Sequence, residues 1–139
     1  MATHRVFSSG QLIDPVLASM SIPLLFKPVK IDGEYYADGG IMKNLPASSL
    51  SGKCDFIIGS HVNHLEQNFK VTNTMELLER CIRIGISNTI VDDIPLCNIF
   101  IDPKESGEYS ALSFKLIDEL IDVGYLEALR VLKDYEVVA

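Results

Sequence analysis

The sequence lacks features that define several large classes of protein. Its 12 lysines and arginines are outnumbered by 19 acidic residues, which gives a formal net charge of −7. We expect no nucleic-acid partner, because binding to phosphates needs clustered basic side chains. No apolar run reaches the roughly 18 to 20 residues of a membrane-spanning helix, and the first residues do not resemble a secretory signal. The sequence therefore predicts a cytoplasmic protein.

Any contact with a membrane would be peripheral. Apolar residues such as Leu24, Leu25 and Phe26 could make such a contact. Packing of these three side chains in the core is the simpler interpretation, because charge does not draw an acidic chain to an anionic membrane.

Cysteine is scarce as well. Cys54, Cys81 and Cys97 are odd in number and widely spaced, so they form neither a disulfide framework nor a Cys-x-x-Cys metal site. Reduced, buried thiols are the simple interpretation. His61 and His64 have a spacing that suits a metal ion, but no cysteine or further histidine lies nearby to complete the ligands. We therefore expect no metal site.

The first part of the chain alternates short elements with turn signals. Residues 5–8 are typical of a short strand. Asp14 and Pro15 predict an N-cap followed by proline at the first helical position, and the helix must end within residues 21–23, before a proline. Residues 31–35 predict a hairpin, since Asp32-Gly33 is a dipeptide that type I′ turns favour.

The second part alternates strands with longer helices. Residues 55–62 show no two-residue alternation, which predicts a strand buried on both faces, as in a parallel sheet. Asn73 predicts the N-cap of a helix, with Glu76 three residues on. That helix has a polar stripe and an opposite apolar stripe. The polar stripe holds Glu76, Arg80, Arg83 and Ser87, and the apolar stripe holds Leu78, Ile82, Ile86 and Ile90.

A short buried strand over residues 98–101 and a long final helix complete the pattern. The buried stripe of that helix is predicted to contain Phe114, Ile117, Ile121, Gly124, Ala128 and Val131. Strand, helix, strand, helix in this order predicts an α/β fold with a mostly parallel sheet. No linker or repeat interrupts the pattern, so residues 1–139 are predicted to be a single domain.

Asp38 is the most informative residue. It follows an apolar strand over residues 35–37 and precedes Gly39 and Gly40, so a backbone free to turn sharply places its carboxylate at a strand end. Strand ends are where α/β enzymes keep catalytic groups. The alternative is a turn aspartate that accepts hydrogen bonds from the amides after it, the commonest reason for Asp before Gly. The ordered neighbours over residues 19–50 favour the catalytic interpretation.

Those neighbours closely resemble the second half of the patatin-like phospholipase domain. The matching elements are Ser21-Ile22-Pro23, Phe26, Pro28-Val29, Ile31-Asp32-Gly33, Asp38-Gly39-Gly40 and Asn44-Leu45-Pro46. The resemblance implies a three-layer α/β/α fold and hydrolysis of lipid acyl esters by a Ser–Asp dyad that needs no cofactor. It implies that Asp38 is the general base. Gly39 and Gly40 would allow the serine to come close to Asp38, and Asn44 would brace the loop.

The same family carries a Gly-rich oxyanion loop and a Gly-x-Ser-x-Gly nucleophile motif upstream of its aspartate. Neither motif occurs in these 139 residues, and Ser8-Ser9-Gly10 lacks the preceding glycine. We interpret the chain as the C-terminal portion of the domain: a fragment that carries the base, lacks the nucleophile and is inactive alone. Its lipid or acyl-ester substrate would bind through the missing half.

The hydrophobic content of 47% suits a fragment that self-associates through an uncovered face, although a compact α/β domain with a buried parallel sheet is also apolar. Two alternatives keep the chain whole. In one it is a non-catalytic lipid- or protein-binding α/β module, with Asp38 as a structural turn residue. In the other it is a structural subunit that completes its fold with another chain.

Overall fold

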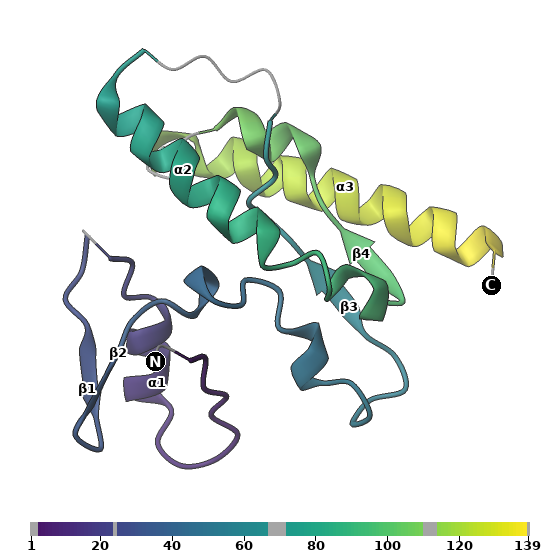
Figure 1. The fold of residues 1–139 in the computed structure, drawn as a ribbon. Coiled ribbons are helices and arrows are strands. Elements are labelled where there is room, and N and C mark those ends of the chain that lie inside the picture. The colour runs from purple at the N-terminus through teal and green to yellow at the C-terminus, as the bar shows by residue number, and fades with distance from the viewer. Residues whose placement is uncertain (1–2, 24, 67–71, 110–113, 139) are drawn as a thin grey trace. The chain divides into compact units, whose positions relative to one another are not determined.

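The computed structural model describes residues 3–23, 25–66, 72–109 and 114–138. The chain divides into two compact units, Met1–Asn44 and Leu45–Ala139. Each unit has a two-stranded sheet of its own, antiparallel in the first and parallel in the second (Figure 1). Short 3-10 helices connect the larger elements: η1 (Gly39–Ile41), η2 (Ala47–Ser49), η3 (Ile94–Leu96), η4 (Lys104–Glu108) and η5 (Phe114–Leu116).

Helix α1 (Ile13–Ser19) of the first unit lies where the sequence predicts a helix, but it begins earlier. Its N-cap is Leu12, whose side chain caps nothing, so the predicted N-cap at Asp14 is wrong. Asp14 instead lies in the first turn, where a negative charge interacts favourably with the helix dipole. Pro15 is tolerated there because the first-turn N–H groups have no intrahelical acceptor. The C-cap is Met20, so the helix ends before Pro23 as predicted.

The predicted hairpin is confirmed. Strands β1 (Val29–Ile31) and β2 (Glu34–Tyr36) pair antiparallel, with Val29 opposite Tyr36. The two turn residues, Asp32 and Gly33, have φ values of 51° and 90°. A type I′ turn needs positive φ at both positions, which Asp tolerates and Gly adopts freely. The strand ends at Tyr36, so Asp38 follows it by two residues.

The strand predicted over residues 5–8 is wrong, because the segment makes side-chain contacts in place of strand pairing. The guanidinium of Arg5 lies 4.7 Å from the ring centroid of Phe7 and donates a hydrogen bond to the Tyr36 hydroxyl. The Phe7 and Tyr36 rings meet edge to face with centroids 5.4 Å apart. These contacts hold the segment beside the hairpin without adding a strand to it.

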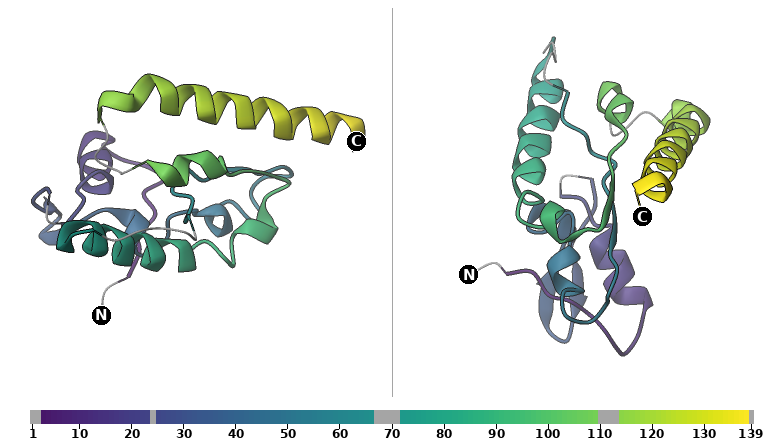
Figure 2. Two further views of the ribbon diagram at one scale, coloured as in Figure 1. Left: turned by 90° about the horizontal axis from the view of Figure 1, so that it is seen from above. Right: turned by 90° about the vertical axis from the view of Figure 1, so that its right-hand side faces the viewer.

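The second unit has three layers. Strands β3 (Ile58–Ser60) and β4 (Ile99–Ile101) pair in parallel, with Ile58 opposite Ile99. Helix α2 (Thr74–Asn88) connects them and lies on one side of the strands, whereas helix α3 (Ile117–Val138) lies on the other side (Figure 2). The predicted α/β class with parallel pairing is confirmed.

The core of the second unit lies beside the start of β3. Its buried apolar residues are Leu45, Ala47, Ile57 and Ile90, with Ile94, Cys97 and Phe100 packed around them. Asp93 is fully buried, and its Oδ1 accepts a hydrogen bond of 2.6 Å from the Ser48 backbone N–H. That bond ties η2 to the chain just before η3. Gly59 is needed in β3, because a Cβ there would lie 2.6 Å from the Cys97 Sγ.

Strand β3 is shorter and more exposed than predicted. It spans three residues rather than 55–62, and Ile58 within it is 56% exposed. The expectation of burial on both faces is therefore wrong for this chain. The physical reason is the size of the sheet: in the part of the chain that the structure describes, β4 is the one partner of β3.

The predicted cap of helix α2 is confirmed, whereas the predicted burial of its apolar stripe is wrong for Leu78 and Ile82. The Asn73 side chain accepts a hydrogen bond of 3.0 Å from the Glu76 N–H, and the Glu76 carboxylate accepts from the N–H and hydroxyl of Thr72. Of the predicted apolar stripe, Leu78 and Ile82 are each 40% exposed, Ile86 is half-buried, and Ile90 is buried beyond the helix end. Residues of the polar stripe are half-buried instead: Glu76, Arg80, Arg83 and Ser87.

Arg83 shows why the helix is turned this way. Its guanidinium donates hydrogen bonds to the Glu79 carboxylate and to the Tyr109 backbone carbonyl, and its side chain is 12% exposed. A two-stranded sheet offers little apolar surface, so these polar bonds set the face that is covered. Leu78 and Ile82 of the apolar stripe are left exposed.

Several other predicted core positions are exposed. Helix α3 begins at Ile117, and both Ile117 and Ile121 are exposed, whereas Ala128 and Val131 are half-buried. A Cβ on Gly124 would meet no atom within 4 Å, and the side chain of Phe114 lies outside the described part.

The apolar cluster and the thiols also differ from expectation. Leu25 and Phe26 are exposed rather than packed in a core, and Leu24 lies outside the described residues. Cys54 and Cys81 are free and exposed, and Cys97 is half-buried, so the expectation of buried thiols is wrong for two of the three.

Candidate functional site

The loop that follows β2 presents Asp38 as the N-cap of η1. Its backbone is not helical, with φ −47° and ψ 122°, and its Oδ1 accepts a hydrogen bond of 2.7 Å from the Gly40 N–H. The Gly39 carbonyl then accepts from the N–H groups of Met42 and Lys43. The Asp38 side chain is half-buried. A carboxylate is thus held in one orientation by its own loop.

The residues that follow helix α1 anchor this loop. The Asp38 N–H donates a hydrogen bond of 3.0 Å to the carbonyl of Ser21, which follows the helix. Ser21 is buried, and its hydroxyl donates a bond of 2.7 Å to the Leu17 carbonyl within α1. The Ser-Ile-Pro stretch and the Asp-Gly-Gly stretch are therefore neighbours in space.

The two glycines after Asp38 have different surroundings. A Cβ on Gly40 would lie 2.9 Å from the Asp38 Oδ1 and 3.8 Å from the Asn44 side chain, whereas a Cβ on Gly39 would meet no atom within 4 Å. Gly40 is thus the glycine that lets its N–H approach the carboxylate. Asp38, Gly40 and Asn44 lie together, and Gly39 lies at the exposed side of the same turn.

This geometry can serve both interpretations of Asp38. The bond to the Gly40 N–H is the one that a turn aspartate makes. It uses one carboxylate oxygen, and a carboxylate has two oxygens with about four acceptor sites. A fixed carboxylate with a second oxygen is what a general base requires once a proton donor lies within hydrogen-bond reach.

A second polar group lies at the carboxyl ends of the parallel strands. His61 directly follows β3, and Asp102 directly follows β4. The His61 Nδ1 lies 2.9 Å from the Asp102 Oδ1, and the His64 Nδ1 lies 2.8 Å from the Oδ2. The two histidines were singled out by the sequence analysis, but Asp102 was not. The signal that could have found it is its position after a predicted parallel strand.

The electrostatics of Asp102 follow from these contacts. Burial alone would raise the pKa of its carboxyl group, but the hydrogen bonds from His61 and His64 outweigh burial and lower that pKa. Both histidines turn their Nδ1 atoms to one carboxylate. In the described ranges no group of three or more His, Cys, Asp or Glu side chains is arranged to hold a metal ion.

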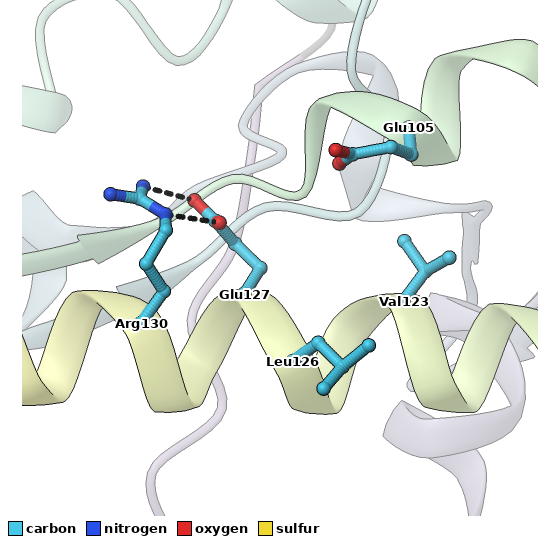
Figure 3. A pocket seen from close by; sticks show the side chains of 5 residues that line it. All are labelled: Glu105, Val123, Leu126, Glu127 and Arg130. Carbon is cyan, nitrogen blue, oxygen red and sulfur yellow. Dashed lines mark hydrogen bonds and ion pairs between the residues drawn. The ribbon is translucent and has the colours of Figure 1, made fainter.

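A hollow of about 270 Å³ lies between η4 and α3 (Figure 3). It is lined by Glu105, Val123, Leu126, Glu127 and Arg130. Arg130 makes two hydrogen bonds to Glu127, of 2.8 and 2.7 Å, which lower the pKa of the Glu127 carboxyl group. Because the guanidinium is already paired, also with Asp134 at 3.1 Å, the hollow has no strong net charge to attract an anion.

Comparison with known proteins identifies the segment that carries Asp38. Residues 3–51 match the family model described as patatin-like phospholipase. This segment of the chain is patatin-like. The matching segment includes Asp38, Gly39, Gly40 and Asn44, and the family resemblance seen in the sequence is confirmed.

Three mycobacterial proteins are also similar to this chain. One is an uncharacterized NTE family protein of Mycobacterium bovis, and two are uncharacterized NTE family proteins of Mycobacterium tuberculosis strains CDC 1551 and H37Rv. Each is 33% identical over 82 residues, which cover 55% of this chain and 23% of the relative. The match thus spans about a quarter of each relative's length. Among the described residues, no helix is both long and apolar enough to cross a membrane.

Proposed function

We propose that the chain carries the general base of a patatin-like serine lipid acyl hydrolase, of the phospholipase or esterase type, and that the nucleophilic serine lies outside these residues. The supporting observation is the Asp38 loop. Within the segment that matches the family, a strand end, a buried serine anchor and a required glycine together fix one carboxylate.

In the proposed reaction, Asp38 takes the proton of the serine hydroxyl directly, without a histidine. The serine oxygen forms a bond to the ester carbonyl carbon, and the alcohol part of the lipid leaves with the proton. Water then releases the acyl group by the reverse sequence of proton transfers. An ordinary aspartate is a weak base at neutral pH, so the reaction depends on exact aim and on exclusion of water by the completed site.

The 139-residue chain should be inactive by itself under this proposal. The test is hydrolysis of a short-chain p-nitrophenyl ester by this chain and by a longer protein that includes an upstream Gly-x-Ser-x-Gly segment, each beside its Asp38→Asn variant. We expect turnover by the longer protein alone, and its loss in the variant. Equal turnover by the longer protein and its variant would reject Asp38 as the base.

The exposed side of α2 supports a proposal about partners. Met75, Leu78 and Ile82 are exposed along one side of this helix, and Cys81 lies beside them. We propose that another polypeptide surface covers this side, either the remainder of the enzyme or a second copy of the chain. A non-catalytic binding module would also use such a surface. Light scattering alone therefore cannot distinguish the hydrolase from the binding module, whereas the ester assay can.

A further inference from the structure

The hydrogen bonds of the His61–Asp102–His64 group define where its protons lie. The lowered pKa of Asp102 keeps its carboxyl group ionised at neutral pH, and an ionised carboxylate only accepts hydrogen bonds. Each histidine must therefore donate from a protonated Nδ1. In a neutral imidazole this leaves the Nε2 atom with a lone pair and no hydrogen.

The two Nε2 atoms have different surroundings. The His61 side chain is 4% exposed, and its Nε2 is buried without a hydrogen-bond partner among the described residues. A proton added there would become a buried donor without an acceptor, which is unfavourable. The His64 side chain is 25% exposed, so solvent or a ligand can reach that ring and solvate a new N–H. Proton uptake is therefore assigned to His64.

We propose that His64 and Asp102 form a general-base pair that accepts a proton from a hydroxyl group of water or an alcohol, with His61 as a buried positioning residue. The His64 Nε2 forms the new N–H bond while the O–H bond of the water or alcohol breaks, and the electron pair stays on the oxygen. The positive charge of the resulting imidazolium is balanced by the Asp102 carboxylate. This site does not depend on the role proposed for Asp38.

Neighbouring elements pack against this pair. The His61 ring stacks on Phe100 of β4 with an angle of 19° between the planes. A Cβ on Gly107 would lie 3.0 Å from the His64 carbonyl oxygen, so η4 packs directly against the segment that carries His64. The group also lies at the carboxyl ends of two parallel strands, where ligands of open α/β sheets bind.

Other charged groups surround the pair. Helix η4 carries Lys104 and Glu105, helix α3 carries Glu127 and Arg130, and Glu66 lies next to Gly107 on the segment that carries His64. The negative charge of Asp102 raises the pKa of Glu127, and the positive charge of Lys104 lowers it. These groups are therefore within electrostatic reach of Glu127. Arg130 is paired with Glu127, so it does not replace the histidines as the partner of Asp102.

Acylation by diethyl pyrocarbonate tests the proposal in the 139-residue protein, because the reagent reacts with an accessible imidazole nitrogen that bears a lone pair. Modified sites are quantified by peptide mass spectrometry. We expect His64 to react about tenfold faster than the exposed His4 and with a rate that rises with pH, and His61 to stay unmodified. Asp102→Asn should bring the rate at His64 down to that of His4.

Nitrogen-detected NMR of the histidine rings gives an independent measurement on the unmodified protein. It should show both His61 and His64 as Nδ1–H tautomers at neutral pH, and backbone amide spectra would show whether Asp102→Asn remains folded. The proposal is overturned if His64 reacts no faster than His4, if His61 reacts as fast as His64, or if either ring is an Nε2–H tautomer.

Discussion

Asp38 and Asp102 both follow a strand, but their carboxylates are held in opposite ways. The Asp38 carboxylate accepts from an N–H two residues further on, within its own loop. The Asp102 carboxylate accepts from two histidines that are 41 and 38 positions away in the sequence. The first arrangement is formed by residues of one local turn, whereas the second forms only after two strands pair.

This difference has a chemical consequence. An asparagine at position 38 could accept the same hydrogen bond from Gly40 through its amide oxygen, so the turn does not require an acid. An asparagine at position 102 could accept from one histidine but would present an N–H to the other. Substitution by asparagine therefore isolates acid chemistry at Asp38 and disrupts structure at Asp102.

Apart from replacement of Asp38 itself, the largest effect expected within the Asp38 loop is that of Gly40→Ala. In the longer enzyme we expect about a 100-fold fall in kcat/KM, because the new Cβ would displace the Asp38 carboxylate. Gly39→Ala is the matched substitution, and its Cβ would meet no atom within 4 Å. Its effect should be much smaller, and equal losses in the two variants would contradict the assigned role of Gly40.

His61→Ala should produce the largest loss of stability in the Asp102 group. We expect the free energy of unfolding to fall by about 2 kcal/mol, because a buried ring and its bond to Asp102 are both lost. Substitution of the more exposed His64 by alanine should lower the free energy of unfolding by less. Urea denaturation measures both, and a larger loss for His64→Ala would reverse the assignment of His61 as the buried anchor.

The pH dependence of stability separates Asp102 from its asparagine variant. Its pKa is lower in the folded protein than its usual value of 3.8. At a pH between the folded-state and unfolded-state pKa values, the unfolded chain therefore binds more protons than the folded one. The stability that Asp102 contributes is present above about pH 4 and is lost as the pH falls through the folded-state pKa. The difference in unfolding free energy between the protein and Asp102→Asn should shrink in acid, and a difference that grows would contradict this sign.

A smaller effect is expected at the start of α2. Asn73→Ala should lower the free energy of unfolding by about 1 kcal/mol, because the helix loses its N-cap bond to the Glu76 N–H. Asn88→Ala at the other end of the helix is the control, and it should change stability by less than about 0.5 kcal/mol. Thermal or urea unfolding compares the pair, and equal losses would show that the cap adds nothing.

The smallest effect on stability is expected on the exposed side of α2. Replacing Leu78 and Ile82 by serine should change the free energy of unfolding by no more than about 0.5 kcal/mol in the isolated chain, where both side chains are largely exposed. Light scattering should show less self-association than for the unchanged protein. A large loss of stability would mean that these residues already pack within the chain.

Sequence predicted the elements whose signals are local. Asp32-Gly33 specified its turn, Asn73 its helix cap, and the order of strands and helices specified parallel pairing. Burial was predicted less well, because it depends on what covers an element. With two strands in the described sheet, Ile58 and Ile82 lie exposed although their patterns are those of core residues.

The two candidate sites follow the same rule. The Asp38 loop could be found because its turn residues adjoin it in the chain. The pairing of Asp102 with His61 has no local signal of this kind, because it depends on the register between β3 and β4. The position of Asp102 after a predicted parallel strand is the one indication of it in the sequence.

The most direct test of the central claim compares two aspartates in the longer protein that includes the upstream Gly-x-Ser-x-Gly segment. Asp38→Asn should lower kcat/KM for a p-nitrophenyl ester by at least about 100-fold, since general-base catalysis contributes about 10² to 10⁴. Asp32→Asn is the control, because asparagine also tolerates the positive φ of the hairpin turn, and activity should stay within about twofold of the unchanged enzyme. Near-normal activity of Asp38→Asn would contradict the account and leave Asp38 as a structural turn residue.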